Sequence, residues 1–572
     1  DLNAPGTPVE IDLDLQAPAE DVVTFLKQAS FNPLPKLPIT IANPKGEMQA
    51  LISLAFDAFT GSDSDEVNWD AVQYAIDASL QNVSGITAMD AYTIANISGP
   101  LQLSNTSYHT DMKAQVAGAP TTFTYTQKDN APEHYAITTT LPIAELSDLA
   151  PALADYARGA VGIDASFARQ GETISGFKAE LDLTPAALSV ADLGYVKPKN
   201  TAAKATITQQ SATTYAMDYA SQQDRVTGTL KGNPIEGDIQ AVVIDRLQSG
   251  GNDIALEWQP LPQGDRIFVH GNKLNLTPIL ESEDEGDGSG LSDFPNVQLA
   301  IDVKEISGAN ELSLRNVKGN LDCQTGRCES AELLADQADG KLAIRIYQDQ
   351  GRRFAMQAYP ADYFFGWLNV TSRLRGGKLG IDGVYDDSQA SSPLVGRIRL
   401  DDFTVKDAPI LGRLLNLASI TGLVETLSTS GISFEYFKSD LVFADDVADL
   451  KDLHAAGASI GILGKAQVNL KTDLVDIRGN LVPAYTINSL LSKVPLVGEL
   501  LAGDEGAGIV GFDFRVHGDA DDPDVTVNPL SGFTPGFTRK FFNLFSTPLD
   551  TEADNTEPAA ATPEAVPPAQ SN

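Results

Sequence analysis

Apolar and polar residues alternate one by one through long stretches of this 572-residue chain. Side chains of a β-strand point to opposite faces in turn, so each stretch predicts a strand with one apolar and one polar face. Such strands are typical of antiparallel sheets that are wetted on one side. The sequence therefore predicts a mainly β fold. The apolar members of four such stretches are Val9, Ile11, Leu13 and Leu15; Val297, Leu299, Ile301 and Val303; Ala466, Val468 and Leu470; and Val510, Phe512, Phe514 and Val516.

Helical periodicity is rare and local. Apolar residues at spacings of three and four predict helices at residues 21–29, 143–158, 409–427 and 486–501. Because these segments are few and short, we expect them to cap or cover the sheet.

Two segments carry neither pattern. Residues 281–290 read ESEDEGDGSG, and without apolar residues they predict an exposed loop or linker. Residues 547–572 are rich in Pro, Ala and Glu, which predicts a disordered tail. We therefore expect five regions: an N-terminal β segment (1–140), a middle β segment with a helical insert (141–280), the acidic loop (281–293), a C-terminal β region (294–546) and the tail (547–572).

The charge balance excludes one class of partner. Lys and Arg number 40 against 77 Asp and Glu, a formal net charge of −37, and no basic stripe offsets it. Because a nucleic acid backbone repels such a polyanion, we expect no nucleic acid partner. No uninterrupted apolar run reaches the roughly 18 residues that a membrane-spanning helix requires.

The chain has two cysteines, Cys323 and Cys328, separated by Gln-Thr-Gly-Arg. These four residues read as a hairpin turn, which would place the cysteines opposite each other on paired strands. Facing Cα atoms lie about 4.5 to 5.5 Å apart, within disulfide range. Free thiols are the alternative, and a zinc site lacks further ligands. A disulfide would imply an oxidising compartment.

Motifs that resemble catalytic signatures lack the required context. Residues 506–511 fit G-x-G-x-x-G, but they follow a predicted helix and precede a predicted strand, the reverse of a dinucleotide site. Residues 457–461 fit G-x-S-x-G, but a predicted strand follows where a nucleophile elbow needs a helix. The five His are scattered, and nothing singles out a pair of carboxylates. We predict no catalytic residue, metal site or cofactor, and no enzymatic activity.

A set of short segments, taken in order, resembles the C-terminal region of the AsmA-like proteins of Gram-negative bacteria, in particular the YhdP branch of the AsmA/TamB superfamily. The resemblance is specific over residues 396–545 and weaker near Cys323 and over 90–128. The segments are 397–411 (RIRLDDFTVKDAPIL), 431–434 (GISF), 479–488 (GNLVPAYTIN), 494–498 (VPLVG), 522–530 (DPDVTVNPL) and 534–537 (TPGF).

This resemblance implies a periplasmic protein of the bridge-like lipid transfer type, anchored in the inner membrane by an N-terminal helix. It implies an elongated, twisted sheet that curls into a groove with an apolar floor, along which phospholipid acyl chains pass toward the outer membrane. Because the chain begins at Asp1 and shows no anchor, we expect it to be the C-terminal portion of a longer protein.

Two groups of residues are the candidate sites for this function. The first comprises apolar strand residues expected to line the groove: Val468, Leu470, Ile477, Val510, Phe512, Phe514 and Val516. The second is expected to contact a membrane or a partner: Phe537, Phe541, Phe542, Leu544 and Phe545. Alternation alone does not separate an open groove from a packed core. The alternative function is a periplasmic scaffold that supports outer membrane biogenesis through protein contacts.

Overall fold

The computed structural model describes most of the chain in twelve stretches. They are residues 7–28, 40–58, 72–88, 92–146, 153–171, 173–233, 238–281, 296–324, 326–418, 421–483, 511–520 and 522–528.

The protein is mainly β, with one long open antiparallel sheet and a few short helices, which confirms the predicted fold class. The chain divides into two compact units. Unit 1 comprises Asp1–Ser372 and Leu379–Leu394, and unit 2 comprises Arg373–Lys378 and Val395–Asn572. Strands β23 (Leu374–Tyr385) and β24 (Leu394–Val405) contain the divisions between them.

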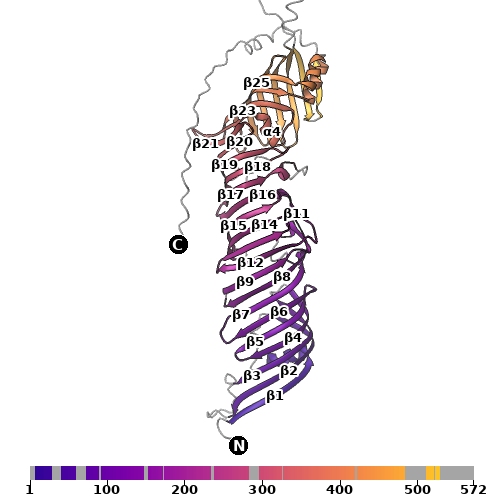
Figure 1. The fold of residues 1–572 in the computed structure, drawn as a ribbon, viewed down its shortest axis with the longest axis vertical. Coiled ribbons are helices and arrows are strands. Elements are labelled where there is room, and N and C mark those ends of the chain that lie inside the picture. The colour runs from indigo at the N-terminus through magenta and orange to yellow at the C-terminus, as the bar shows by residue number, and fades with distance from the viewer. Residues whose placement is uncertain are drawn as a thin grey trace, which may run out of the picture. The chain divides into compact units, whose positions relative to one another are not determined.

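Consecutive strands of unit 1 pair with one another and follow each other like the rungs of a ladder (Figure 1). The first nine are β1 (Thr7–Pro18), β2 (Thr40–Ala58), β3 (Gln73–Ala88), β4 (Tyr92–Ser104), β5 (Ser107–Val116), β6 (Ala119–Lys128), β7 (Glu133–Pro142), β8 (Ala157–Gln170) and β9 (Thr173–Asp182).

After β9 the sheet continues through β12, because β10 (Ala186–Val190) and β11 (Tyr195–Lys197) leave it to form a side ladder on β8. The later strands are β12 (Ala203–Ser211), β13 (Thr214–Ser221), β14 (Arg225–Asn233), β15 (Asp238–Ser249), β16 (Asn252–Leu261), β17 (Gly264–Asn275), β18 (Val297–Ser307), β19 (Ser313–Gln324), β20 (Arg327–Gln337), β21 (Gly340–Gln348) and β22 (Arg352–Ala358).

One pairing in unit 1 departs from the antiparallel pattern. Strand β17 pairs with β18 in parallel, with Ile267 opposite Leu299. A parallel pair cannot be closed by a tight turn, so the chain must return to the same end of the sheet. The connection contains α3 (Thr277–Leu280).

The helices of unit 1 confirm one prediction and correct another. The helix predicted at 21–29 is α1 (Ala19–Gln28). The helix predicted at 143–158 is only η3 (Ile143–Leu146) and α2 (Leu153–Tyr156) within the described residues, and Ala157 already begins β8. Ile143 and Ala157, near the two ends of that segment, are buried in one cluster with Ala186 of β10. The remaining helical elements are η4 (Ala191–Leu193) and α4 (Ala361–Trp367).

The described part of unit 2 contains a second run of antiparallel strands and two helices. The predicted helix at 409–427 is divided into α5 (Pro409–Leu417) and α6 (Thr421–Thr429). The strands are β25 (Ile432–Ala444), β26 (Val447–Ala456), β27 (Ile460–Asn469), β28 (Leu474–Pro483), β29 (Phe512–Asp519) and β30 (Asp524–Asn528). Among the described residues of the whole chain, no helix is long and apolar enough to span a membrane.

Candidate functional site

One face of the sheet in unit 1 carries a row of apolar side chains that crosses every strand from β6 to β22. Directly opposed residues of paired strands point to the same face, so the register alone defines the row. Its single polar member is Gln209, between Phe177 and Tyr215. The apolar members, in spatial order, are Tyr125, Tyr135, Phe167, Phe177, Tyr215, Leu230, Val242, Trp258, Ile267, Leu299, Leu321, Ala331, Ile346 and Phe354.

Two further rows run beside it on the same face. One consists of Phe123, Ile137, Ala165, Ala179, Ile207, Met217, Gly228, Ile244, Leu256, Val269, Ile301, Gly319, Leu333, Ile344 and Met356. The other consists of Ile163, Leu181, Ala205, Tyr219, Val226, Leu247, Ile254, Gly271, Val303 and Val317. We call the three rows together the apolar lane. It contains no charged residue.

The lane is not sealed like a packed core. Most of its side chains are only partly buried, including Met217, Leu256 and Ile344. The intervening residues point to the other face and are polar there, as in the exposed ion pairs Lys178–Glu180 and Lys318–Asp302. The lane is therefore an apolar strip that keeps contact with solvent.

Aromatic rings line one part of the first row. Tyr135 lies between Tyr125 and Phe167, with ring centroids 5.0 and 4.8 Å away. Phe177 continues the series, 6.5 Å from Phe167 and 6.1 Å from Tyr215. These separations are those of favourable aromatic pairs, so the rings support one another across six strands.

The Gln209 side chain hydrogen-bonds the backbone of β9 where the aromatic series crosses an irregular register. Strand β9 shifts its pairing with β8 between Ser166 and Ala168, which leaves part of its backbone without a ladder partner. The Gln209 side chain accepts a hydrogen bond from the Phe177 amide (3.1 Å) and donates one to the Ile174 carbonyl (3.0 Å). The one polar side chain of the first row therefore supplies hydrogen bonds to two backbone groups of β9.

Three tyrosines of the lane, Tyr125, Tyr135 and Tyr219, have raised pKa values. Burial, followed by the charge of Glu133, raises the pKa of Tyr125 to about 12. Burial also raises the pKa of Tyr135 and Tyr219. Since all three shifts are upward, these phenols act as uncharged hydrogen-bond donors at physiological pH.

The same apolar face is covered at the β1 end. Helix α1 buries Ala19, Val22 and Leu26 against residues of β2 and β3, among them Ile52 and Ile76. The first row continues from Tyr125 toward the β1 end. Beyond Thr110 it consists of Leu101, Ala78, Ala50 and Leu15. The helix predicted to cap the sheet therefore packs on the extension of the lane.

The predicted groove residues of unit 2 also share one face of their strands. Ile477 lies directly opposite Val516, and Phe514 lies opposite Gly479. Phe514 and Val516 are 7% and 0% exposed, so in unit 2 they pack as core. Val468, Ile477 and Phe512 are partly buried. Leu470 follows the end of β27 and is 52% exposed.

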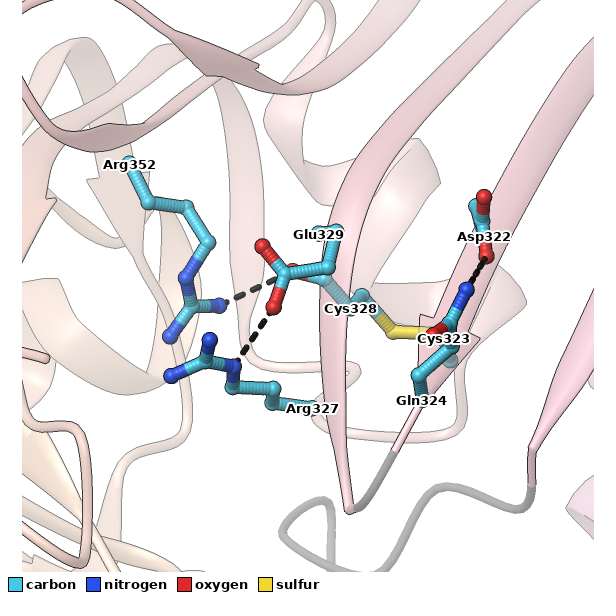
Figure 2. Close-up of a disulfide and its surroundings, with 7 residues drawn as sticks. All are labelled: Asp322, Cys323, Gln324, Arg327, Cys328, Glu329 and Arg352. Carbon is cyan, nitrogen blue, oxygen red and sulfur yellow. Dashed lines mark hydrogen bonds and ion pairs between the residues drawn. A yellow bond between two sulfur atoms is a disulfide. The ribbon is translucent and has the colours of Figure 1, made fainter. Parts of the chain in front are cut away.

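The predicted disulfide is confirmed. Cys323 and Cys328 are opposed in the β19–β20 hairpin and joined through their sulfur atoms (Figure 2). Arg352, on β22, donates a hydrogen bond to the Cys328 carbonyl (2.9 Å). Its guanidinium also pairs with Asp387 (2.7 Å) and lies 3.7 Å from the centre of the Tyr385 ring.

Other sequence predictions are either located or untested. The G-x-S-x-G segment lies in the turn between β26 and β27, where the Gly457 amide donates to the Ile460 carbonyl, so it is not a strand-to-helix elbow. Val510, the helix predicted at 486–501 and all five membrane-contact candidates lie outside the described residues: Phe537, Phe541, Phe542, Leu544 and Phe545. Most of the acidic loop lies outside them as well.

The apolar lane was missed by sequence reasoning. Strands such as β16 and β18 alternate strictly, but many others mix Thr, Ala and Gly into both faces, so the rows are not evident in the separate segments. The signal that could have found it is the recurrence of an aromatic or large aliphatic residue near the middle of each strand of about ten residues.

Comparison with known proteins gives no assignment. No protein family, no curated protein and no solved structure matches this chain.

Proposed function

We propose that this chain binds phospholipids by their acyl chains along the apolar lane and conducts them between the inner and outer membranes, without covalent chemistry. The observation that carries the proposal is the continuity of uncharged, mostly partly buried rows: two rows run across the strands from β6 to β22, and the third runs from β8 to β19. A strip of this kind offers acyl chains a surface out of water, and each methylene that leaves water gains about 0.8 kcal/mol.

The dimensions of the lane agree with a path for several lipids. Three rows span about 14 Å along the strands, from a rise of about 3.4 Å per residue. Fifteen strands spaced by about 4.8 Å extend for about 65 Å. One leaflet of a bilayer contributes about 15 Å of hydrocarbon, so the lane is several acyl chains long.

Two further points support the proposal. The resemblance to AsmA-like proteins implies bridge-like lipid transfer in the periplasm, and the Cys323–Cys328 disulfide is of a kind that persists in oxidising compartments. Continuity also favours transport over simple binding, since a storage site for one lipid needs no strip of this length.

Photocrosslinking tests the proposal on neighbouring residues. A benzophenone amino acid placed at Leu256 would face the lane, whereas one at Glu257 would face the polar side. In living Gram-negative cells we expect a phospholipid adduct at position 256 and background signal at position 257, measured by mass spectrometry of the purified protein.

The two positions share strand and local backbone, so expression and folding are matched. Equal labelling at both positions, or none at either with the protein intact, would overturn the proposal. Crosslinks from position 256 to protein only would favour the scaffold function instead.

A further inference from the structure

One rim of the aromatic part of the lane carries a pair of opposite charges. Glu133 begins β7 and Arg169 lies near the end of β8, and the two residues are directly opposed in the ladder. Both point to the lane face. Glu133 lies two positions from Tyr135 and Arg169 two positions from Phe167, and both rings belong to the first row. We call Glu133 and Arg169 the rim pair.

The rim pair keeps binding capacity on its Arg169 side. The Glu133 Oε2 atom accepts the hydroxyl of Tyr135 (2.7 Å), and the carboxylate also interacts with the hydroxyl of Tyr125. The Arg169 Nε atom donates to the Gly171 carbonyl (2.9 Å), while its two terminal nitrogens bind nothing within the described residues. The two charged groups form no ion pair with each other, although their strands are adjacent.

The opposite rim of the lane is closed at this level. Ala186 of β10 pairs with Gly159 of β8 and is 0% exposed. The hydroxyl of Tyr195, on β11, is hydrogen-bonded to that of Tyr219 in the lane. We call β10 and β11 together the β10 strap. Lys197 of β11 is 3% exposed and holds the strap by donating hydrogen bonds to the carbonyls of Ala186 and Thr201. Strands β10 and β11 therefore occupy the edge of the lane opposite the rim pair, at whose own edge Arg169 is exposed and Glu133 is partly exposed.

The chemistry of this open rim suits a zwitterion. A guanidinium with free terminal nitrogens binds a phosphodiester through two parallel hydrogen bonds. An ammonium group is held by a carboxylate, here that of Glu133. Opposed residues are about 4.5 to 5.5 Å apart at Cα, a spacing comparable to that between phosphate and ammonium in a phosphoethanolamine group.

We propose that the rim pair is a headgroup station, at which Arg169 binds the phosphodiester and Glu133 the ammonium of a zwitterionic phospholipid whose acyl chains lie in the lane. This inference rests on the proposed function and adds a lipid class to it. The lane binds acyl chains and does not distinguish headgroups. Headgroup selectivity therefore arises at the rim pair, on β7 and β8.

Lipid uptake from mixed vesicles tests the station. The full chain is incubated with vesicles of equal phosphatidylethanolamine and phosphatidylglycerol with identical acyl chains, then re-isolated, and bound lipid is counted by class. We expect about fivefold enrichment of phosphatidylethanolamine, the factor typical of a partly desolvated cation site. Glu133→Gln keeps an acceptor for Tyr135 and should reduce the enrichment to about onefold; Arg169→Gln should lower the uptake of both lipids.

The controls are Glu257→Gln and Arg266→Gln, which remove one charge each from the polar face and should retain the enrichment. Soluble phosphoethanolamine in excess should not displace the lipid, since the acyl chains supply most of the affinity; displacement would overturn a lipid-bound station. Equal uptake of both classes by the native chain, or full enrichment in Glu133→Gln, would overturn the headgroup station and leave the proposed function standing. Absence of any bound lipid would overturn both.

Discussion

Arg352 is a buried charged residue of unit 1 with several partners. Its side chain is 3% exposed, and its guanidinium makes two hydrogen bonds to Asp387, one from Nη2 (2.7 Å) and one from Nε (3.2 Å). A third hydrogen bond reaches the Cys328 carbonyl, and the Tyr385 ring covers the guanidinium plane. Lysine has neither the planar fork nor the number of donors for this arrangement. One side chain therefore ties the disulfide hairpin to β22 and to the turn after β23.

The Arg352–Asp387 pair predicts a specific loss of stability in acid. The hydrogen bond from Arg352 lowers the pKa of Asp387 from 3.8 to about 2. A carboxyl group with a depressed pKa in the folded state stabilises the fold above its unfolded pKa, and this contribution is lost as the pH falls from about 4 to about 2. We expect Asp387→Asn to lower the free energy of unfolding by about 2 kcal/mol at neutral pH, because Arg352 stays buried without its counter-charge.

Urea denaturation at several pH values measures this effect. The difference between the native chain and Asp387→Asn should shrink as the pH falls through the window of 4 to 2. Asp349→Asn is the matched control, since its ion pair with Arg353 is exposed on both sides and should contribute little. A pH-independent difference would show that the loss comes from packing and not from charge.

At the scale of elements, the strands of the two units use their apolar faces differently. Strand β13 presents Met217 on the lane with part of its side chain exposed, whereas β29 presents Val516, which is 0% exposed. The alternating pattern is stricter in β29 than in β13. In this pair of strands the stricter alternation goes with the more tightly packed face.

Substitution by a charged residue distinguishes the partly exposed face of the lane from the buried face in unit 2. We expect Met217→Asp to keep its fold, because the carboxylate reaches water, and to reduce bound lipid at least several-fold by interrupting the lane. Val516→Asp should unfold unit 2, since burying an unpaired carboxylate costs several kcal/mol. Circular dichroism melting and lipid mass spectrometry distinguish the outcomes. Unfolding of Met217→Asp would show that the lane is a sealed core.

The strands and the disulfide could be predicted from sequence because their causes are local. Period-two alternation placed β1, β18, β27 and β29, and a four-residue turn placed the two cysteines in register. The register of the sheet is not local. It decides that Tyr135 stands beside Phe167 and that Glu133 faces Arg169, and neither pairing has a signature in the separate segments.

The helical prediction at 143–158 is met only in part, by η3 and α2 within the described residues. Ile143 and Ala157 are buried in one cluster with Ala186, more than twenty residues further along the chain. This tertiary contact with β10 is not visible in the local sequence. The β10 strap closes one side of the lane, so the region hardest to predict is also one that shapes the proposed site.

For the whole molecule, charge and apolar surface are segregated. The chain has a formal net charge of −37, yet none of the lane's three rows contains a charged residue. Charged side chains of the strands lie on the polar face at Glu180, Asp218 and Glu332, and at the edge of the lane in the rim pair. The body of the protein should therefore be repelled by anionic membranes while its lane accepts their lipids.

This repulsion predicts an unusual dependence of lipid uptake on salt. The Debye length falls from about 30 Å at 0.01 M to about 8 Å at 0.15 M ionic strength, so salt screens the polyanion from an anionic surface. Uptake from vesicles rich in phosphatidylglycerol should accelerate on the order of tenfold over this range. Uptake from purely zwitterionic vesicles, the control, should change little. Stopped-flow transfer of a fluorescent phospholipid measures both rates. If salt instead slows uptake from anionic vesicles, attraction by a basic region would govern the encounter, and net charge would not be the controlling property.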